Sequence, residues 1–395
     1  NGSELVTGGN FANSNVGDNI ALLSGVEVTS NPTIYTLYIW IDGNMSNPNT
    51  MYNQNFEFRL NAEATDEQPM SMQTLQKLGL SSNGVKDTIT SAATTDDGIW
   101  ETQDDYGTTY YFRGAVTNNY VQFAGYYWRI IRINGDGSIR MIYDGTSAHA
   151  NGESSTDRQI STSAFNPADD DNAYVGYMYG QTEASSYSAA HENTNNSTIK
   201  TVVDNWYKTN IQDAGYSDKV ADVIYCNDRK IYTGSSWNGY GTLGYGTNAT
   251  TYEPASRTLT WTNGSSSWAS TQTIKMTCSQ KNDAFTVDDT SKGNGALTYP
   301  VGLITVDEAL AGGGKGGAVN SSSNRSYYLY TGNYYWTMSP YHFNGGSADE
   351  FFVISDGSIG SDSVYYTRGV RPVLSLKSDI SVTGSGTQND PFVVQ

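Results

Sequence analysis

The residue types that most often carry out chemistry in enzymes are few in this sequence and lie far apart. The three histidines are His149, His191 and His342, and no H-E-x-x-H pair or Cys/His cluster with metal-ligand spacing occurs. No G-x-S-x-G segment supplies a nucleophilic serine. The sequence therefore predicts no metal site, no cofactor and no enzymatic activity.

The two cysteines, Cys226 and Cys278, form no C-x-x-C redox motif. Neither has a local setting that would stabilise a reactive thiolate. An even pair of cysteines in an exported chain is typical of one disulfide. We predict that disulfide, and two reduced thiols in the core are the alternative.

Two further segments resemble ligand-binding loops only in part. Residues 166–174, N-P-A-D-D-D-N-A-Y, carry the hard oxygen ligands that Ca²⁺ prefers, but without the spacing of an EF-hand. In a chain this acidic we favour a solvated loop. Residues 311–317, A-G-G-G-K-G-G, lack the residue order of a phosphate-binding loop and are expected to be the exit of a helix.

The composition restricts the partners and the location of the protein. The chain has 395 residues, and its 40 Asp and Glu against 22 Lys and Arg give a formal charge of −18. This charge repels phosphate backbones, so no nucleic acid partner is expected. Few lysines and many Asn, Ser, Thr, Gly and Tyr residues favour an extracellular location. No apolar run of about 18 residues occurs, so no membrane insertion is predicted.

Residues 339–369 form a segment of unusual composition between two core-like ends. Apart from Glu350, its residues are those that codons of the form NNY encode, and Lys, Gln, Met and Trp are absent from it. Aromatic side chains together with Ser, Asn and Gly are also the chemistry of antibody paratopes. A β-hairpin with a glycine-rich turn at residues 354–367 is compatible with this interpretation, because a hairpin can present such side chains.

Several elements that would position this segment are recognisable. Residues 120–144 predict a hairpin, with the turn N-G-D-G at 134–137 supplying positive φ angles. An apolar stripe predicts a helix within 195–211, capped by Ser197. Thr305 and Glu308 predict a capping box at a second helix start. Residues 70–80 predict a short helix, and residues 232–270 are expected to be loops.

The N-terminal residues predict a separate unit. Residues 33–42 and 55–64 each alternate apolar and polar side chains, which is typical of half-buried strands. We therefore predict a β-rich, sandwich-like module over residues 1–66, followed by a linker with a short helix over 67–109. A larger mixed domain follows over 110–395.

Four segments resemble a group of surface proteins of gut Firmicutes. They are the hairpin F-A-G-Y-Y-W-R-I-I-R-I-N-G-D-G, the segments Y-P-V-G-L-I-T-V-D-E-A-L and N-Y-Y-W-T-M-S-P, and the closing G-V-R-P-V-L-S-L. That group is similar to C-type-lectin-fold variable proteins of the formylglycine-generating-enzyme-like type, which retroelements diversify. The resemblance covers roughly residues 110–395. It implies an α+β fold, namely a C-type-lectin-like mixed domain behind the β-sandwich-like module.

The resemblance also implies two roles among the C-terminal residues, a fixed structural frame and variable ligand-binding positions. Trp336, Val370, Arg371, Pro372 and Leu374 would be the fixed frame. The variable, ligand-binding positions would be Tyr341, His342, Asn344, Ser347, Asp349, Glu350, Phe351, Phe352, Ser358, Ser361, Asp362, Ser363, Tyr365, Tyr366 and Arg368.

The resulting hypothesis is an extracellular, surface-displayed protein that binds a macromolecular ligand, either a protein or a glycan on another cell or phage surface. The E-P-N and W-N-D motifs of calcium-dependent sugar-binding lectins are absent. Two alternatives remain. One is a structural subunit or tip adhesin of a surface fibre, which would pair through an edge strand at 33–42. The other is an enzyme of the formylglycine-generating kind, which would require two free thiols.

Overall fold

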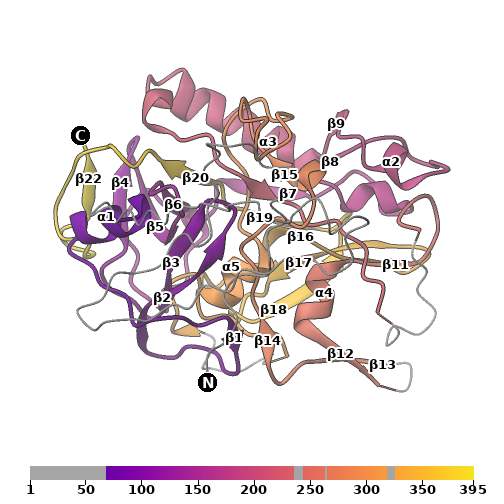
Figure 1. Cartoon of the computed structure of the whole chain (residues 1–395), viewed down its shortest axis with the longest axis horizontal. Helices are drawn as coiled ribbons and strands as arrows, with labels where there is room; N and C mark the ends of the chain where they lie inside the picture. Colours follow the sequence, from indigo (N-terminus) through magenta and orange to yellow (C-terminus); the bar gives the residue numbers. More distant parts are fainter. Residues whose placement is uncertain (1–67, 235–242, 263–264, 318–324) are drawn as a thin grey trace, which may run out of the picture. The chain divides into compact units, whose positions relative to one another are not determined.

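The computed structural model describes residues 68–234, 243–262, 265–317 and 325–395, which belong to one compact unit that begins at Gln68. Helix and strand are mixed in this unit and sheet predominates (Figure 1), as expected for the α+β class. The module predicted at residues 1–66, with its strands at 33–42 and 55–64, lies outside the described residues.

The first large sheet has eight strands. Six follow one another in the order β2-β3-β5-β4-β22-β21, while β6 pairs with both β5 and β20. Their bounds are β2 (Asp96–Asp104), β3 (Gly107–Gly114), β4 (Tyr120–Phe123), β5 (Tyr126–Ile133), β6 (Ile139–Gly145), β20 (Val373–Leu376), β21 (Val382–Thr383) and β22 (Phe392–Val394). The C-terminal strand β22 is parallel to β4, so the end of the described unit is tied to its early hairpin.

The second large sheet has six strands and contains the C-terminal segment of unusual composition. Its order is β18-β17-β16-β19-β7, with β11 also pairing with β16. The bounds are β7 (Ser161–Ala164), β11 (Thr250–Thr251), β16 (Tyr335–Phe343), β17 (Ala348–Val353), β18 (Ile359–Ser363) and β19 (Thr367–Val370). β17 and β18 form the hairpin that the sequence predicts around its glycine-rich turn.

Short helices and two-stranded ribbons complete the unit. The helices are α1 (Met70–Lys77), α2 (Tyr187–Ala190), α3 (Thr198–Tyr207), α4 (Glu253–Thr258) and α5 (Val306–Ala311). The ribbons pair β1 (Thr88–Ile89) with β14 (Gln272–Thr273), β8 (Met178–Tyr179) with β9 (Asn195–Asn196), β10 (Tyr225–Cys226) with β15 (Ala284–Phe285), and β12 (Leu259–Thr262) with β13 (Ser265–Trp268).

The local sequence signals are largely confirmed. The hairpin β5–β6 closes through the predicted turn, in which Gly137 has the predicted positive φ, at +83°. The prediction of a positive φ at Gly135 is wrong. Ser197 caps α3 by accepting a hydrogen bond from the Lys200 amide. At α5 the Thr305 and Glu308 side chains make both hydrogen bonds of the capping box.

Two predictions about organisation are wrong. The segment 67–109 is not a linker, because α1 and β2 belong to the compact unit and bury Leu75 and Ile99 in its core. The described part of residues 232–270 is not only loop, since it contains α4, β11, β12 and β13. β1 and β11 are ordered by pairing with the distant strands β14 and β16, whereas β2 pairs with its neighbour β3, and β12 with β13.

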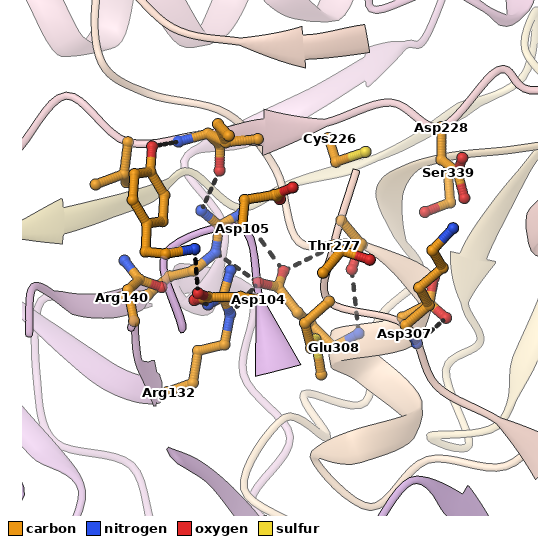
Figure 2. A pocket seen from close by; sticks show the side chains of 17 residues that line it. Asp104, Asp105, Arg132, Arg140, Cys226, Asp228, Thr277, Asp307, Glu308 and Ser339 are labelled. Atoms are coloured by element: carbon orange, nitrogen blue, oxygen red, sulfur yellow. Dashed lines mark hydrogen bonds and ion pairs between the residues drawn. The ribbon is translucent and has the colours of Figure 1, made fainter. Parts of the chain in front are cut away.

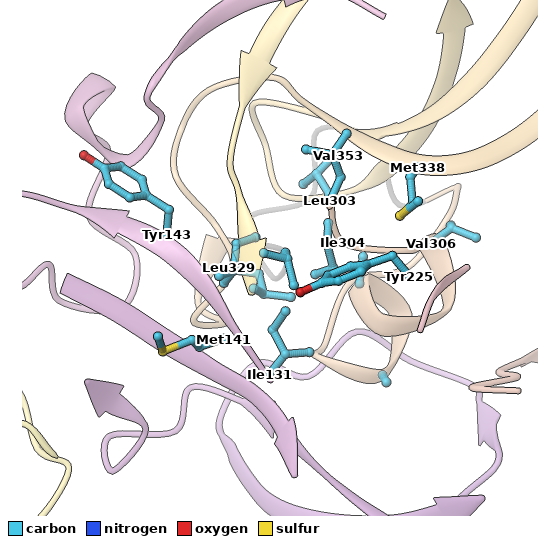
Figure 3. Packing of buried hydrophobic residues seen from close by; sticks show 14 of the residues in the cluster. Ile131, Met141, Tyr143, Tyr225, Leu303, Ile304, Val306, Leu329, Met338 and Val353 are labelled. Carbon is cyan, nitrogen blue, oxygen red and sulfur yellow. The ribbon is translucent and has the colours of Figure 1, made fainter. Parts of the chain in front are cut away.

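The core lies between the two large sheets, around α5. Figure 3 shows Ile131 and Met141 of the first sheet, Met338 and Val353 of the second, and Ile304 just before α5, all among the buried hydrophobic residues. α5 contacts β3 of the first sheet and β16, β17 and β18 of the second. The hydrophobic effect of this shared burial therefore holds the second sheet in place.

Buried ion pairs supplement this core. Arg132 contacts Asp104 at 2.6 Å and Glu308 at 3.0 Å, and Arg140 contacts the same Glu308 carboxylate at 2.6 Å. Arg158 and Arg371 both contact Asp144, at 2.7 Å and 2.9 Å. Separating the two partners of such a pair would leave a buried charge uncompensated. The ion pairs therefore hold the strands and the helix that carry them in fixed relative positions.

In the part of the chain that the structure describes, no helix is long and apolar enough to cross a membrane.

Candidate ligand-binding surface

The frame predicted around the C-terminal segment is buried. Trp336, Val370, Pro372 and Leu374 lie in the core. The fifth frame residue, Arg371, is also buried and donates hydrogen bonds to the Tyr143 and Leu329 carbonyl oxygens and to Asp144. The ends of the segment therefore serve packing, as the sequence predicts.

The exposed large hydrophobic side chains of the segment are two adjacent tyrosines in the connection between β18 and β19. The exposed fraction is 62% for Tyr365 and 52% for Tyr366. Their rings are 6.4 Å apart, centroid to centroid, at an interplanar angle of 62°. The Ser363 carbonyl accepts a hydrogen bond from the Tyr366 amide at 3.0 Å, so a turn holds the tyrosines outward.

These tyrosines join other aromatic side chains through Arg368. The Arg368 guanidinium carbon lies 5.1 Å from the ring centroid of Tyr334, 5.5 Å from Phe352 and 5.6 Å from Tyr366. Tyr334 is 43% exposed and stacks on Phe352 at 5.7 Å. We call the set Tyr334, Tyr365, Tyr366 and Arg368 the aromatic patch, which packs against the largely buried Phe352. Its tyrosines combine large contact area with few rotatable bonds.

Three carboxylates surround the turn that carries Tyr365 and Tyr366. Asp362 forms an ion pair with Arg368. Asp169 accepts hydrogen bonds from the hydroxyls of Ser363 at 2.5 Å and Ser347 at 3.3 Å. Asp349 lies opposite Ser363 in the β17–β18 register. We call Asp169, Asp349 and Asp362 the carboxylate rim.

The remaining polar positions near the rim are held by local hydrogen bonds. The Ser347 hydroxyl donates to Asp349 at 2.7 Å, and His342 Nε2 lies 2.9 Å from the Asp349 carboxylate. Asn344 is exposed, and its side-chain oxygen accepts from the amides of Gly346 and Ser347 in the β16–β17 turn. Ser361 is half-buried on β18.

Several predicted ligand-binding residues are instead part of the core, and the prediction that they face a partner is wrong. Phe351 and Ser358 are fully buried. Phe351 packs on Tyr341 at 5.1 Å and near Trp268 at 6.4 Å, while Ser358 bonds to Asp356 within the hairpin turn. Glu350 is fully buried, and Tyr341, His342 and Phe352 are largely buried. Residues of both faces of β17 are buried, so alternation along that strand exposes neither face, while Tyr341 and His342 lie on β16, which is an interior strand of the sheet.

Glu350 has an unusual environment for a buried carboxyl group. Neither of its side-chain oxygens has a hydrogen-bond partner among the described residues. Burial raises the pKa of Glu350 well above its ordinary value; Arg229 acts in the opposite direction, and Asp349 adds to the increase. This environment favours the protonated, uncharged form over the carboxylate.

Two residues of the surface were missed from the sequence. Tyr334 lies just outside the segment of restricted composition, and only its exposure beside the buried Tyr335 distinguishes it. Asp169 belongs to the acidic segment 166–174, and its hydrogen bond to Ser363 joins residues far apart in the chain. No local pattern reveals either role.

The rest of that acidic segment is more ordered than the predicted solvated loop. Asp171 is buried, and its side chain accepts a hydrogen bond from the Ala173 amide. Asp171 thereby caps the short 3₁₀ helix at Asn172–Val175. No group of three or more His, Cys, Asp or Glu side chains that could hold a metal ion is found within the described ranges.

The predicted disulfide between Cys226 and Cys278 is present. Cys226 lines a cavity of about 20 Å³ together with Asp105, Asp228 and the buried ion-pair residues Arg132 and Glu308 (Figure 2). A cavity of this size holds about one water molecule. With both sulfurs bonded to each other, the two free thiols required by the enzyme alternative are not available in this structure.

No family model, curated protein or solved structure matches this chain.

Proposed function

We propose that this protein is an extracellular, surface-displayed binding protein that recognises a macromolecular ligand through the aromatic patch. The observation that carries the proposal is the exposure of Tyr365 and Tyr366 on a turn that is anchored to a buried sheet. Adjacent exposed aromatic side chains on a rigid support are typical of binding surfaces, because they bury much area at little entropic cost.

The proposal includes a C-type-lectin-like fold with a variable C-terminal surface. It is supported by the resemblance described above and by the placement of the segment's ends in the core and of Tyr365 and Tyr366 on the surface. Variation is then expected at exposed and half-buried positions such as Asn344, Asp362 and Arg368. The fibre-subunit alternative relied on residues 33–42, which lie outside the described residues, and no observation favours it.

Screening the full chain against arrayed glycans and displayed extracellular proteins tests the proposal. The double variant Tyr365→Ala/Tyr366→Ala should lose the ligands that the unmodified chain retains, by about 10-fold or more in affinity, as expected for two aromatic anchors. Its melting temperature should stay within a few degrees of the unmodified protein, since both side chains are mostly exposed.

A matched control is Tyr216→Ala. Tyr216 is also exposed, at 39%, but it contacts Phe123 of the first sheet. This variant should keep every ligand. Retention of all ligands by the double variant would refute the proposed surface, and loss of the fold would show that the two tyrosines are structural.

A further inference from the structure

The carboxylate rim beside the aromatic patch carries an excess of negative charge. Asp362 is paired with Arg368, and Asp349 with His342. Asp169 has hydroxyl partners and, among the described residues, no ion pair. The rim therefore carries more negative charge than its own cationic neighbours can balance, and the neighbouring Asp170 is exposed.

The exposed rings add to this preference for positive charge. The face of an aromatic ring is electron-rich and attracts a cation placed over it. Arg368 already uses this arrangement, since it contacts three rings while pairing with Asp362. Tyr365, the most exposed of the rings, has no cation over it in the described part of the chain.

We propose that the patch docks a basic protein segment whose Lys or Arg side chains lie over Tyr365 and Tyr366 and pair with the carboxylate rim. This inference rests on the proposed function and names the chemistry of its ligand. The formal charge of −18 acts in the same direction, because the field of the whole protein attracts cationic partners and repels anionic ones.

The geometry favours a peptide over a sugar ring as the occupant. Tyr365 and Tyr366 are inclined at 62° to each other, so they do not form one flat platform for a pyranose face. Separate long side chains such as Lys and Arg can reach the two inclined rings independently. Their charged ends can then extend to the carboxylate rim.

Selection of random displayed peptides against the full chain tests the inference. Each recovered peptide is re-tested on Tyr365→Ala/Tyr366→Ala to identify peptides that bind through the patch. We expect those peptides to be enriched in Lys and Arg, and to bind about 10-fold more weakly when ionic strength rises from about 0.1 M to about 1 M, which shortens the Debye length from ~10 Å to ~3 Å.

The variant Asp169→Asn isolates the charge of the rim. An amide oxygen can still accept the hydrogen bonds from Ser363 and Ser347, while the negative charge is removed. Binding of the basic peptides should weaken by up to about fivefold, the range for an exposed ion pair. Asp218→Asn, at an exposed carboxylate outside the rim, should leave binding unchanged.

The outcomes separate the two proposals. Tyrosine-dependent peptides that are neutral or acidic would overturn the basic-segment inference and leave the binding surface intact. Basic peptides that bind the double variant as well as the unmodified chain would also overturn it, because they would be bound by the overall charge alone. Recovery of no tyrosine-dependent peptide, together with retention of all ligands in the screen described above, would overturn both.

Discussion

Two buried glutamates, Glu350 and Glu308, have pKa values that their environments shift in opposite directions. Glu350 has no side-chain hydrogen-bond partner in the part of the chain that the structure describes, whereas Glu308 contacts Arg132 and Arg140 and closes the α5 capping box. Burial alone would raise the pKa of Glu308, but the two arginines outweigh burial and lower it. The pKa of Glu350 moves in the opposite direction, mainly through burial.

Glu350→Gln should therefore raise the free energy of unfolding at pH 7, by on the order of 1 kcal/mol. The folded state holds the Glu350 proton at pH values where the unfolded chain releases it, so stability falls as pH rises above the ordinary pKa of 4.5. The gain from the substitution should accordingly shrink as pH is lowered toward 4.5. Chemical denaturation of the variant and the unmodified protein from pH 4 to pH 8 measures this difference in the free energy of unfolding.

Glu308→Gln is the matched control, because Glu308 is equally buried but ion-paired. Its lowered pKa means that the carboxylate stabilises the fold above pH 4.5 and loses this effect as pH falls through the folded-state value. The substitution should cost roughly 3–5 kcal/mol at pH 7. Equal effects of the two substitutions would show that the two environments do not differ as described.

Among the elements, those with strong local signals were predicted from the sequence. Ser197 at α3, the Thr305 and Glu308 box at α5 and the β5–β6 turn are each specified within a few residues. What could not be predicted depends on distant pairing, such as the cover over both faces of β17 that buries Phe351. Tyr365 and Tyr366, which the family resemblance implies as variable positions, are exposed because they lie in the connection between β18 and β19.

The capping box at α5 provides a test at this scale. The Thr305 hydroxyl accepts a hydrogen bond from the Glu308 amide at 3.1 Å. Thr305→Ala removes this acceptor and should lower the free energy of unfolding by about 1 kcal/mol. Thermal or denaturant unfolding monitored by circular dichroism measures the change.

Ser186→Ala is a comparison within the same chain, because Ser186 caps the four-residue α2, of which only Ala190 is buried, whereas every residue of α5 is buried. Its effect should be smaller than that of Thr305→Ala, since less buried structure depends on α2. A larger effect at Ser186 would contradict the central position assigned to α5 between the two sheets.

At the scale of the whole molecule, the disulfide joins β10 to a distant loop across 52 residues of sequence. The enclosed segment includes α4 and β11, and α4 contacts β16 of the second sheet. A cross-link limits the freedom of the unfolded chain more as the loop it closes grows. The disulfide therefore stabilises a region where, apart from α4, the described elements are strands of two to four residues.

Replacing both cysteines, Cys226→Ser together with Cys278→Ser, should lower the free energy of unfolding by about 4 kcal/mol for a loop of this length. A reducing agent should lower the stability of the unmodified protein to a similar extent and leave the double variant unchanged. Equal stability of the reduced and oxidised unmodified protein would contradict a structural disulfide.

The uneven burial of residues 339–369 has a practical consequence for protein engineering. Asn344, Tyr365 and Tyr366 are exposed, and Asp362 and Arg368 are half-buried, whereas Phe351 and Ser358 belong to the interior. A combinatorial library randomised only at the first five positions should yield mostly folded clones, while one randomised across the whole segment should yield few. We therefore expect that the chain can serve as a scaffold for affinity reagents, with these five side chains varied and the buried residues of the sheet kept constant.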